Sequence, residues 1–273
     1  MTAGWHYRES GNGPVLILLH GIGMSHAVWN PVIPELSSVR RVIAFDIPGF
    51  GLTPPLSNRI PLSITNVVDS LEESLADIGI DVPVDFAGNS LGGCLALEAA
   101  RRGIARSVVA ISPTGLWEKH EPAHVRFVFG GLRFTSMHFP RLLKAAVHVS
   151  FLREVLLAIP ISIGSRRMSV HDAIRTIDDL ATSTAFEVTF DNTRASFEGA
   201  GIRVPVTVVF GDRDWILTRS AQRRHNLPPH TQWVEKRGWG HVPMWIDPSG
   251  VSRLILEKIP LPKGEGGSRQ RAG

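Results

Sequence analysis

The stretch Val84-Asp-Phe-Ala-Gly-Asn-Ser-Leu-Gly92 decides the fold. It begins as a short apolar strand, and the residues from Leu91 to Arg101, rich in Ala and Leu, predict a helix that stops at Gly103. Between strand and helix, Gly88-Asn-Ser-Leu-Gly92 forms a sharp turn whose glycines let the backbone pass close to itself. The serine is then strained, with its hydroxyl exposed. The pattern predicts that Ser90 is a nucleophile; the alternative interpretation is a serine that caps the helix.

Four further apolar runs have the length and composition of strands buried on both faces. They are Val15-Leu-Ile-Leu-Leu19, Arg41-Val-Ile-Ala-Phe45, Ser107-Val-Val-Ala-Ile111 and Val206-Thr-Val-Val-Phe210. An amphipathic helix is predicted from Val67 to Ile78, because apolar residues recur there at three- and four-residue spacings. Strands that alternate with helices predict an α/β fold, with a mostly parallel central sheet and helices on both faces.

The alternation stops between Leu116 and Gly199, where only helical patterns are found. A helical segment inserted between two strands of one sheet is expected to cover the carboxyl edge, where ligands bind in open α/β sheets. We therefore predict two parts of one core at 1–115 and 200–262, an all-helical cap at 116–199, and a disordered tail at 263–273 that is rich in Gly and charge.

Composition excludes several classes of protein. The hydrophobic fraction of 43% and the charged fraction of 20% are those of an ordinary globular chain. The net charge of +4 is scattered, without a recognition helix or an aromatic platform, which argues against a nucleic-acid partner. The single cysteine, Cys94, excludes an intrachain disulfide framework and a multi-cysteine metal site. We see no secretory signal and no span, since Val15 to Leu19 is too short, and expect a cytoplasmic protein without stable membrane insertion.

A serine hydroxyl needs a base within hydrogen-bonding reach. Among eleven histidines, His241 is the best placed, because it lies in the glycine-rich loop Lys236-Arg-Gly-Trp-Gly-His241 after a short predicted strand at Gln232-Trp-Val-Glu235. The other histidines fall in polar or turn contexts or in the predicted cap. We predict that His241 is the general base.

The base should be oriented by a carboxylate, and two candidates follow the strand that ends at Phe210. Asp214 lies one turn beyond the strand and can bend toward the neighbouring loop. Asp212 comes directly after a glycine, where a carboxylate tends to cap the turn or to pair with Arg213. Asp214 is the favoured orienting carboxylate, and Asp212 is the alternative.

Negative charge on a tetrahedral intermediate needs preorganised N–H donors. Leu91, directly after the predicted nucleophile, provides one at the start of a helix. The loop His20-Gly-Ile-Gly23 follows the first buried strand, and its Ile22 N–H is the predicted second donor. We interpret His20 itself as structural, with its ring hydrogen-bonded to loop backbone.

Aromatic residues near these loops predict an apolar pocket. Trp215 and Trp239 flank the acid and the base and are the predicted substrate contacts. The predicted cap adds Phe127, Phe129, Phe134, Phe139 and Phe151. The favoured interpretation of the apolar stretch from Val125 to Ile163 is a buried face of the cap. Because this stretch also carries arginines and a lysine, the alternative interpretation is that it makes peripheral contact with a membrane or a lipid substrate.

Five motifs in chain order resemble the α/β-hydrolase superfamily with a helical cap: His20-Gly-Ile-Gly23, Asp46-Ile-Pro-Gly-Phe-Gly51, Gly88-Asn-Ser-Leu-Gly-Gly93, Gly211-Asp-Arg-Asp214 and Gly240-His-Val-Pro243. The resemblance runs from about Tyr7 to Ile259. Two positions depart from the pattern, namely Thr53 where the family often has serine and the missing proline in Trp215-Ile-Leu-Thr218, and neither removes a catalytic group.

The resemblance implies a serine hydrolase without cofactor or metal, and most often a carboxylesterase that cleaves a small, moderately apolar ester through an acyl-enzyme on Ser90. Ser112-Pro-Thr-Gly-Leu116 also resembles carbon–carbon bond hydrolases, which cleave vinylogous diketones. A non-catalytic small-molecule binding protein is the third possibility. Serine rather than aspartate at position 90 argues against haloalkane dehalogenase and epoxide hydrolase chemistry. A small apolar ester or ketone is the expected partner, and the oligomeric state stays open.

Overall fold

The computed structural model describes residues 4–57, 60, 62–193 and 195–261, so the predicted tail at 263–273 lies outside it. The strands are β1 (Tyr7–Ser10), β2 (Val15–Leu19), β3 (Arg41–Phe45), β4 (Val84–Asn89), β5 (Ala105–Ile111), β6 (Val206–Gly211) and β7 (Gln232–Lys236). The helices are α1 (Ile33–Leu36), α2 (Ile64–Asp77), α3 (Leu91–Arg101), α4 (Ala123–His138), α5 (Pro140–Ala146), α6 (Ser150–Leu157), α7 (Val170–Thr182), α8 (Phe186–Asn192) and α9 (Pro248–Lys258).

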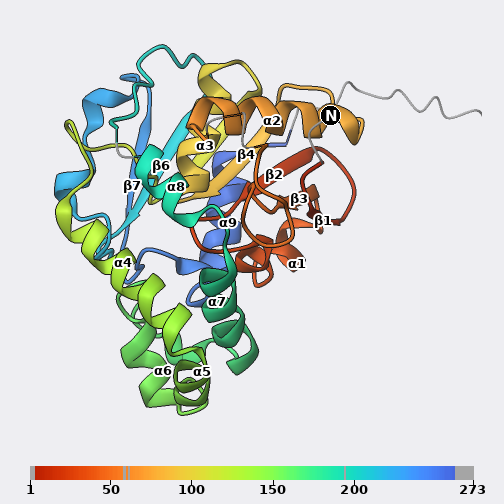
Figure 1. Cartoon of the computed structure of the whole chain (residues 1–273). Helices are drawn as coiled ribbons and strands as arrows, with labels where there is room; N and C mark the ends of the chain where they lie inside the picture. The colour runs from red at the N-terminus through yellow and green to blue at the C-terminus, as the bar shows by residue number, and fades with distance from the viewer. Residues whose placement is uncertain (1–3, 58–59, 61, 194, 262–273) are drawn as a thin grey trace, which may run out of the picture.

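The seven strands form one sheet in the order β1-β3-β2-β4-β5-β6-β7. Strand β1 runs antiparallel to β3, and the other pairings are parallel. The crossovers place helices on both faces of the sheet (Figure 1). The predicted α/β fold with a mostly parallel sheet is therefore confirmed, and β1 is an additional edge strand.

Strand β2 shows how the sheet divides the core. Its side chains alternate between the two faces, as the pleat requires. Ile17 and Leu19 pack in the apolar cluster that includes residues of α2 and α3. Leu16 and Leu18 pack in the cluster on the other face, with residues of α1 and α9. All four side chains are fully buried, which is why the strand reads as a continuous apolar run rather than as an alternating one.

Helices α4–α8 lie between β5 and β6, and we call residues 123–192 the helical insert. An antiparallel bridge between His120 and Ala195 closes its base. The insert projects away from the sheet, with α5 and α6 at its tip (Figure 1). None of the described helices is both long and apolar enough to cross a membrane.

A buried ionic cluster joins β4 to the chain on either side of it. Arg40 has no exposed side-chain surface and donates to Asp85 Oδ2 at 2.8 Å. Arg106 Nε and Ser107 Oγ donate to Asp85 Oδ1 at 3.0 and 2.8 Å. The Asp85 carboxylate thus neutralises the charge of the Arg40 guanidinium, which is shielded from water.

We expect Asp85→Asn to lower the free energy of unfolding by about 3–5 kcal/mol, because Arg40 would remain buried without a counter-charge. The measurement is urea denaturation. The matched control is Glu9→Gln, which removes the partly exposed partner of Arg41 and should cost less than about 1 kcal/mol. Equal losses of unfolding free energy in the two variants would show that the buried cluster stabilises the fold no more than a surface ion pair does.

Candidate active site

Ser90 lies at a strained turn between β4 and α3. Its backbone has φ 53° and ψ −115°, a conformation that residues with a side chain rarely adopt. A Cβ on Gly88 would lie 2.1 Å from Gly92 O, and one on Gly92 would lie 2.1 Å from Leu19 O. Only glycine fits at both positions, so the predicted sharp turn is confirmed. Ser90 precedes the helix but makes no side-chain capping bond, which removes the support for the alternative interpretation.

The loops after β6 and β7 bring Asp214 and His241 together. Asp214 Oδ2 accepts from His241 Nδ1 at 3.0 Å, and both side chains are buried. The backbone N–H groups of Ile216 and Leu217 donate to the other carboxylate oxygen at 3.0 and 2.8 Å. Burial alone would raise the pKa of Asp214, but the neighbouring His241 ring, its hydrogen bond and the Leu217 amide hold this pKa below its usual value. An ionised Asp214 therefore fixes the proton of His241 on Nδ1.

Asp212 has a different environment. Its Oδ1 accepts from Gly238 N at 2.6 Å and so ties the β6 loop to the turn after β7. The side chain is exposed. Of the two carboxylates weighed from the sequence, the structure brings Asp214 to His241 and leaves Asp212 at a turn.

Ser90 and His241 line the same cavity. Ser90 Oγ and His241 Nε2 are both buried, so the prediction of an exposed Ser90 hydroxyl is wrong. Within the described part of the chain neither atom has a hydrogen-bond partner. Leaving a buried polar atom unpaired costs about 1–3 kcal/mol, so such atoms are usually satisfied or functional. Ser90 Oγ, which can lose a proton, and His241 Nε2, which can accept one, both belong to residues that line this cavity.

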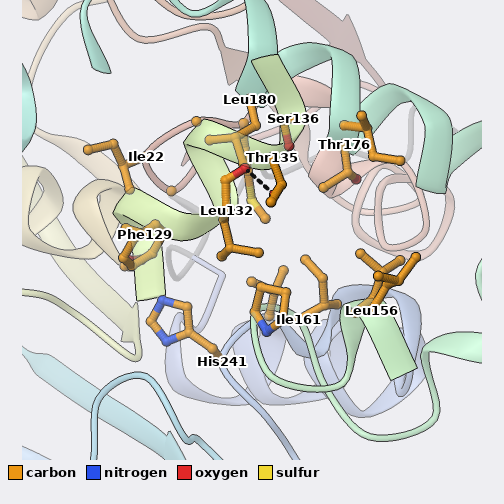
Figure 2. Close-up of a pocket in the computed structure, with 18 of the residues that line it drawn as sticks. Ile22, Phe129, Leu132, Thr135, Ser136, Leu156, Ile161, Thr176, Leu180 and His241 are labelled. Atoms are coloured by element: carbon orange, nitrogen blue, oxygen red, sulfur yellow. Dashed lines mark hydrogen bonds between the residues drawn. The ribbon is translucent and has the colours of Figure 1, made fainter. Parts of the chain in front are cut away.

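The cavity has a volume of about 100 Å³ and lies between Ser90 and the helical insert. His241, Phe129 and Ile22 lie on one side of it, with Leu156 and Thr176 on the opposite side (Figure 2). Its threonines donate to their own helix backbones, Thr135 to Leu132 O and Thr176 to Asp172 O, both at 3.0 Å. They therefore add little polarity to the cavity. Its described lining contains no Lys, Arg, Asp or Glu.

A smaller cavity, of about 20 Å³, borders Ser90 together with Ile22 and Leu91. Leu91 N–H is one of the first four amides of α3, which have no acceptor inside the helix. The loop that carries Ile22 packs closely on Ser90, since a Cβ on Gly21 would lie 3.3 Å from Ser90 Cβ. Both predicted oxyanion donors thus belong to residues beside Ser90.

His20 has the structural role predicted for it. Its Nδ1 bonds Gly21 O at 2.7 Å, and its Nε2 accepts from Ile47 N at 2.9 Å. Burial is the main reason that its pKa falls to about 4. The ring is therefore neutral at neutral pH and holds the loop before Ile22 against the turn that follows β3.

The predicted substrate contacts Trp215 and Trp239 do not reach the cavity, and neither is among its lining residues. Trp239 is buried in the core, where its Nε1 donates to Asp247 Oδ2 at 2.9 Å. Asp247 also caps α9, so this tryptophan anchors the helix instead of facing substrate. Trp215 is 47% exposed. Both tryptophans are close to Asp214 and His241 in sequence, but their side chains do not line the cavity.

Of the five phenylalanines predicted for the pocket, Phe129 alone is among the described residues that line the cavity. The other four are exposed, namely Phe127, Phe134, Phe139 and Phe151. The favoured interpretation, a buried face of the cap, is therefore wrong for these residues. They lie on the outer sides of α4–α6, whose inner sides line the cavity.

Three hydrogen bonds that hold the backbone around His241 had no distinctive signal in the sequence. Asn89 Nδ2 donates to His241 O at 2.9 Å. From the helical insert, Ser162 Oγ accepts from Gly240 N at 2.9 Å, and Ile161 O accepts from Val242 N at 2.9 Å. The backbone on both sides of His241 is thus held by the insert.

We expect Ser162→Ala to lower kcat for an ester by about tenfold, because Gly240 N would lose its buried acceptor and the His241 loop would shift. The KM should change little, since Ser162 does not line the cavity. Steady-state kinetics and thermal unfolding check this together. The control is Ser150→Ala, an exposed serine of the same insert. An unchanged kcat in a folded Ser162→Ala protein would show that the insert does not position the base.

Known proteins resemble this chain over most of its length. The family model for the alpha/beta hydrolase fold matches residues 14–248. Epoxide hydrolase EphH of Mycobacterium tuberculosis is 30% identical over 211 residues, which are 72% of this chain and 95% of that protein. The pimeloyl-(acyl-carrier protein) methyl ester esterase of Aliivibrio salmonicida is 34% identical over 102 residues, 37% of this chain and 35% of the esterase.

Among solved structures, the meta-cleavage product hydrolase CumD of Pseudomonas fluorescens IP01 superimposes with a TM-score of 0.72 at 21% identity, over 93% of each chain. A likeness at this identity supports the fold alone. The range matched by the family model spans the strands from β2 to β7. The chain belongs to the α/β-hydrolase family.

Proposed function

We propose that the chain is a serine hydrolase that cleaves the carboxylic ester of a small, apolar substrate through an acyl-enzyme on Ser90. The observation that carries the proposal is the hydrogen-bonded pair of His241 and Asp214, of which His241 lines one apolar cavity together with Ser90. The similarity to an ester esterase supports the same chemistry. In this proposal the helical insert is the cap that shields the reaction from water.

In this proposal, acylation uses Ser90, His241 and Asp214 together. His241 Nε2 takes the proton of Ser90 Oγ as the oxygen attacks the carbonyl carbon of the ester. The negative charge that develops on the carbonyl oxygen is stabilised by the N–H groups of Ile22 and Leu91, each worth about 3–4 kcal/mol. The ionised Asp214 stabilises the imidazolium that forms. His241 then gives its proton to the alcohol oxygen, the carbon–oxygen bond breaks, and the acyl group remains on Ser90.

Deacylation repeats these steps with water as the nucleophile. His241 Nε2 takes a proton from water, the resulting oxyanion uses the same two N–H donors, and Ser90 Oγ leaves with the proton returned by His241. The larger cavity under the insert fits the bulkier apolar part of the substrate, and the small cavity beside Leu91 fits a short group.

Epoxide opening is a less suitable reaction for this site, although the relative EphH is named for it. Attack of a serine oxygen on an epoxide carbon would form an ether, which has no carbonyl for water to attack. A carboxylate nucleophile would form an ester that water can cleave, but position 90 is serine. The proposal therefore excludes turnover of epoxides.

Carbon–carbon bond hydrolysis is disfavoured by the charge of the cavity. A dienolate ring-fission substrate is an anion, and burying an anion without a cationic partner is costly. The described lining residues of the large cavity include no Lys or Arg. A neutral ester needs no such partner.

The test compares substrates of three classes at matched concentration: p-nitrophenyl esters of short to medium acyl length, styrene oxide, and a coloured dienolate ring-fission product. We expect ester hydrolysis, with kcat/KM rising as the acyl group lengthens to fill the cavity. Faster bleaching of the dienolate than of any ester would identify a carbon–carbon hydrolase. Absence of turnover with all three would favour the binding protein.

A further inference from the structure

Large apolar side chains on the outside of the helical insert are not covered by any described part of the chain. Leu142 on α5 is 67% exposed, and Phe151 and Val155 on α6 are 70% and 58% exposed. We call these residues, with Phe139, Val149 and Ile159, the outer apolar face. A single exposed apolar residue is ordinary, but a group of this size marks an interaction site.

Helix α6 and the residues that follow it are apolar on two opposite sides. Phe151, Val155 and Ile159 are spaced by four residues and share the outer side. Leu157 and Ile161 face inward and line the cavity next to Ser90. A helix that is apolar all round is normally buried. One helix therefore separates the substrate cavity from the outer apolar face.

Positive charges predominate in the chain segment that carries this face. Between residues 134 and 167 the only acidic residue is Glu154, and its carboxylate accepts from the backbone N–H groups of Gly164 and Arg166 at 2.6 and 2.8 Å. Arg141, Arg166 and Arg167 are exposed. Within the described residues these three arginines form no salt bridge, whereas Lys144 pairs with Asp178 at 2.5 Å. We call Arg141, Arg166 and Arg167 the rim arginines; their positive charges are not paired with any described carboxylate.

We propose that the outer apolar face docks on an anionic lipid bilayer. The apolar side chains enter the boundary between headgroups and acyl chains, and the rim arginines pair with lipid phosphates. A second copy of the chain is a poor occupant, because it would bring two arginine rims together without acidic partners. The docking does not depend on the chemistry at Ser90.

The test is co-sedimentation of the full chain with phosphatidylcholine vesicles that contain or lack phosphatidylglycerol. We expect binding to the anionic vesicles alone, and we expect it to weaken at high salt as the charges are screened. The double variant Phe151→Ser with Val155→Ser should lower the partition coefficient by about tenfold or more. Arg166→Gln with Arg167→Gln should lower it by about fivefold for each charge removed.

The matched control is Phe127→Ser, which removes an even more exposed phenylalanine of the insert outside the outer apolar face and should bind as the parent does. Turnover of a water-soluble ester without vesicles, or thermal unfolding if the chain proves inactive, reports that each variant is folded. Three results would overturn the proposal: no sedimentation with anionic vesicles, equal sedimentation with both kinds, or equal loss in Phe127→Ser. A dimer in light scattering that Phe151→Ser with Val155→Ser dissociates would assign the face to a second copy.

Discussion

Replacing Ser90 with alanine lowers kcat/KM for a p-nitrophenyl ester by about three orders of magnitude or more, because no other group can form the acyl-enzyme. A thousandfold loss corresponds to about 4 kcal/mol of transition-state stabilisation. Fold should be preserved, since Ser90 Oγ makes no hydrogen bond within the described structure. The measurement is steady-state kinetics together with thermal unfolding.

Ser136→Ala is the matched control for this loss. Ser136 is a buried serine on the opposite wall of the same cavity, so the variant removes a hydroxyl from the cavity without touching the predicted chemistry. We expect a change in KM of a few-fold and a kcat close to that of the parent. If Ser90→Ala and Ser136→Ala behave alike, Ser90 does not act as a nucleophile.

Asp214→Asn should lower kcat by about three to four orders of magnitude while the protein stays folded. The amide that replaces the carboxylate can donate to His241 Nδ1, which favours the tautomer with its proton on Nε2. In that tautomer the nitrogen facing the cavity no longer accepts the proton of Ser90. The variant also lacks the negative charge that stabilises the imidazolium.

Asp212→Asn is the control, because its amide oxygen can still accept from Gly238 N. Its kcat should stay within about threefold of the parent value, as expected for a surface substitution away from the reacting atoms. The assignment of the acid would fail if Asp212→Asn lost activity and Asp214→Asn kept it.

Much of the core could be predicted from the sequence because burial on both faces leaves continuous apolar runs. The predicted strands Val15–Leu19 and Arg41–Phe45 match β2 and β3 residue for residue. Strand β1 was not predicted, since Tyr-Arg-Glu-Ser is short and polar and is ordered by pairing with β3 at the sheet edge. Long-range pairing of this kind leaves no local pattern.

The candidate site also has some features that the sequence predicts and others that it does not. Residues fixed by a local turn were predictable, because the glycines around Ser90 show directly where the backbone must bend. The directions of side chains at loop ends were not. Trp239 packs toward Asp247 because of how α9 begins, and Ser162 meets Gly240 through the tertiary packing of the insert. Neither arrangement depends on neighbours in sequence.

In the helical insert, the sequence pattern does not indicate which side of a helix is exposed. Helical periodicity locates apolar positions, but it does not say which of two apolar sides faces the core. In α6 both sides are apolar, and the structure places Leu157 at the cavity and Phe151 at the surface. The outer apolar face could therefore be recognised only once the insert was seen above the sheet.

The most direct test of the nucleophile is labelling with a fluorophosphonate, followed by mass spectrometry of the peptide that contains Ser90. The reagent phosphonylates a serine only where a base and oxyanion donors activate it. We expect one adduct, on Ser90, that is absent from Ser90→Ala and strongly reduced in Asp214→Asn. An unlabelled Ser90 in the folded parent protein, or labelling that persists in Ser90→Ala, would contradict this expectation.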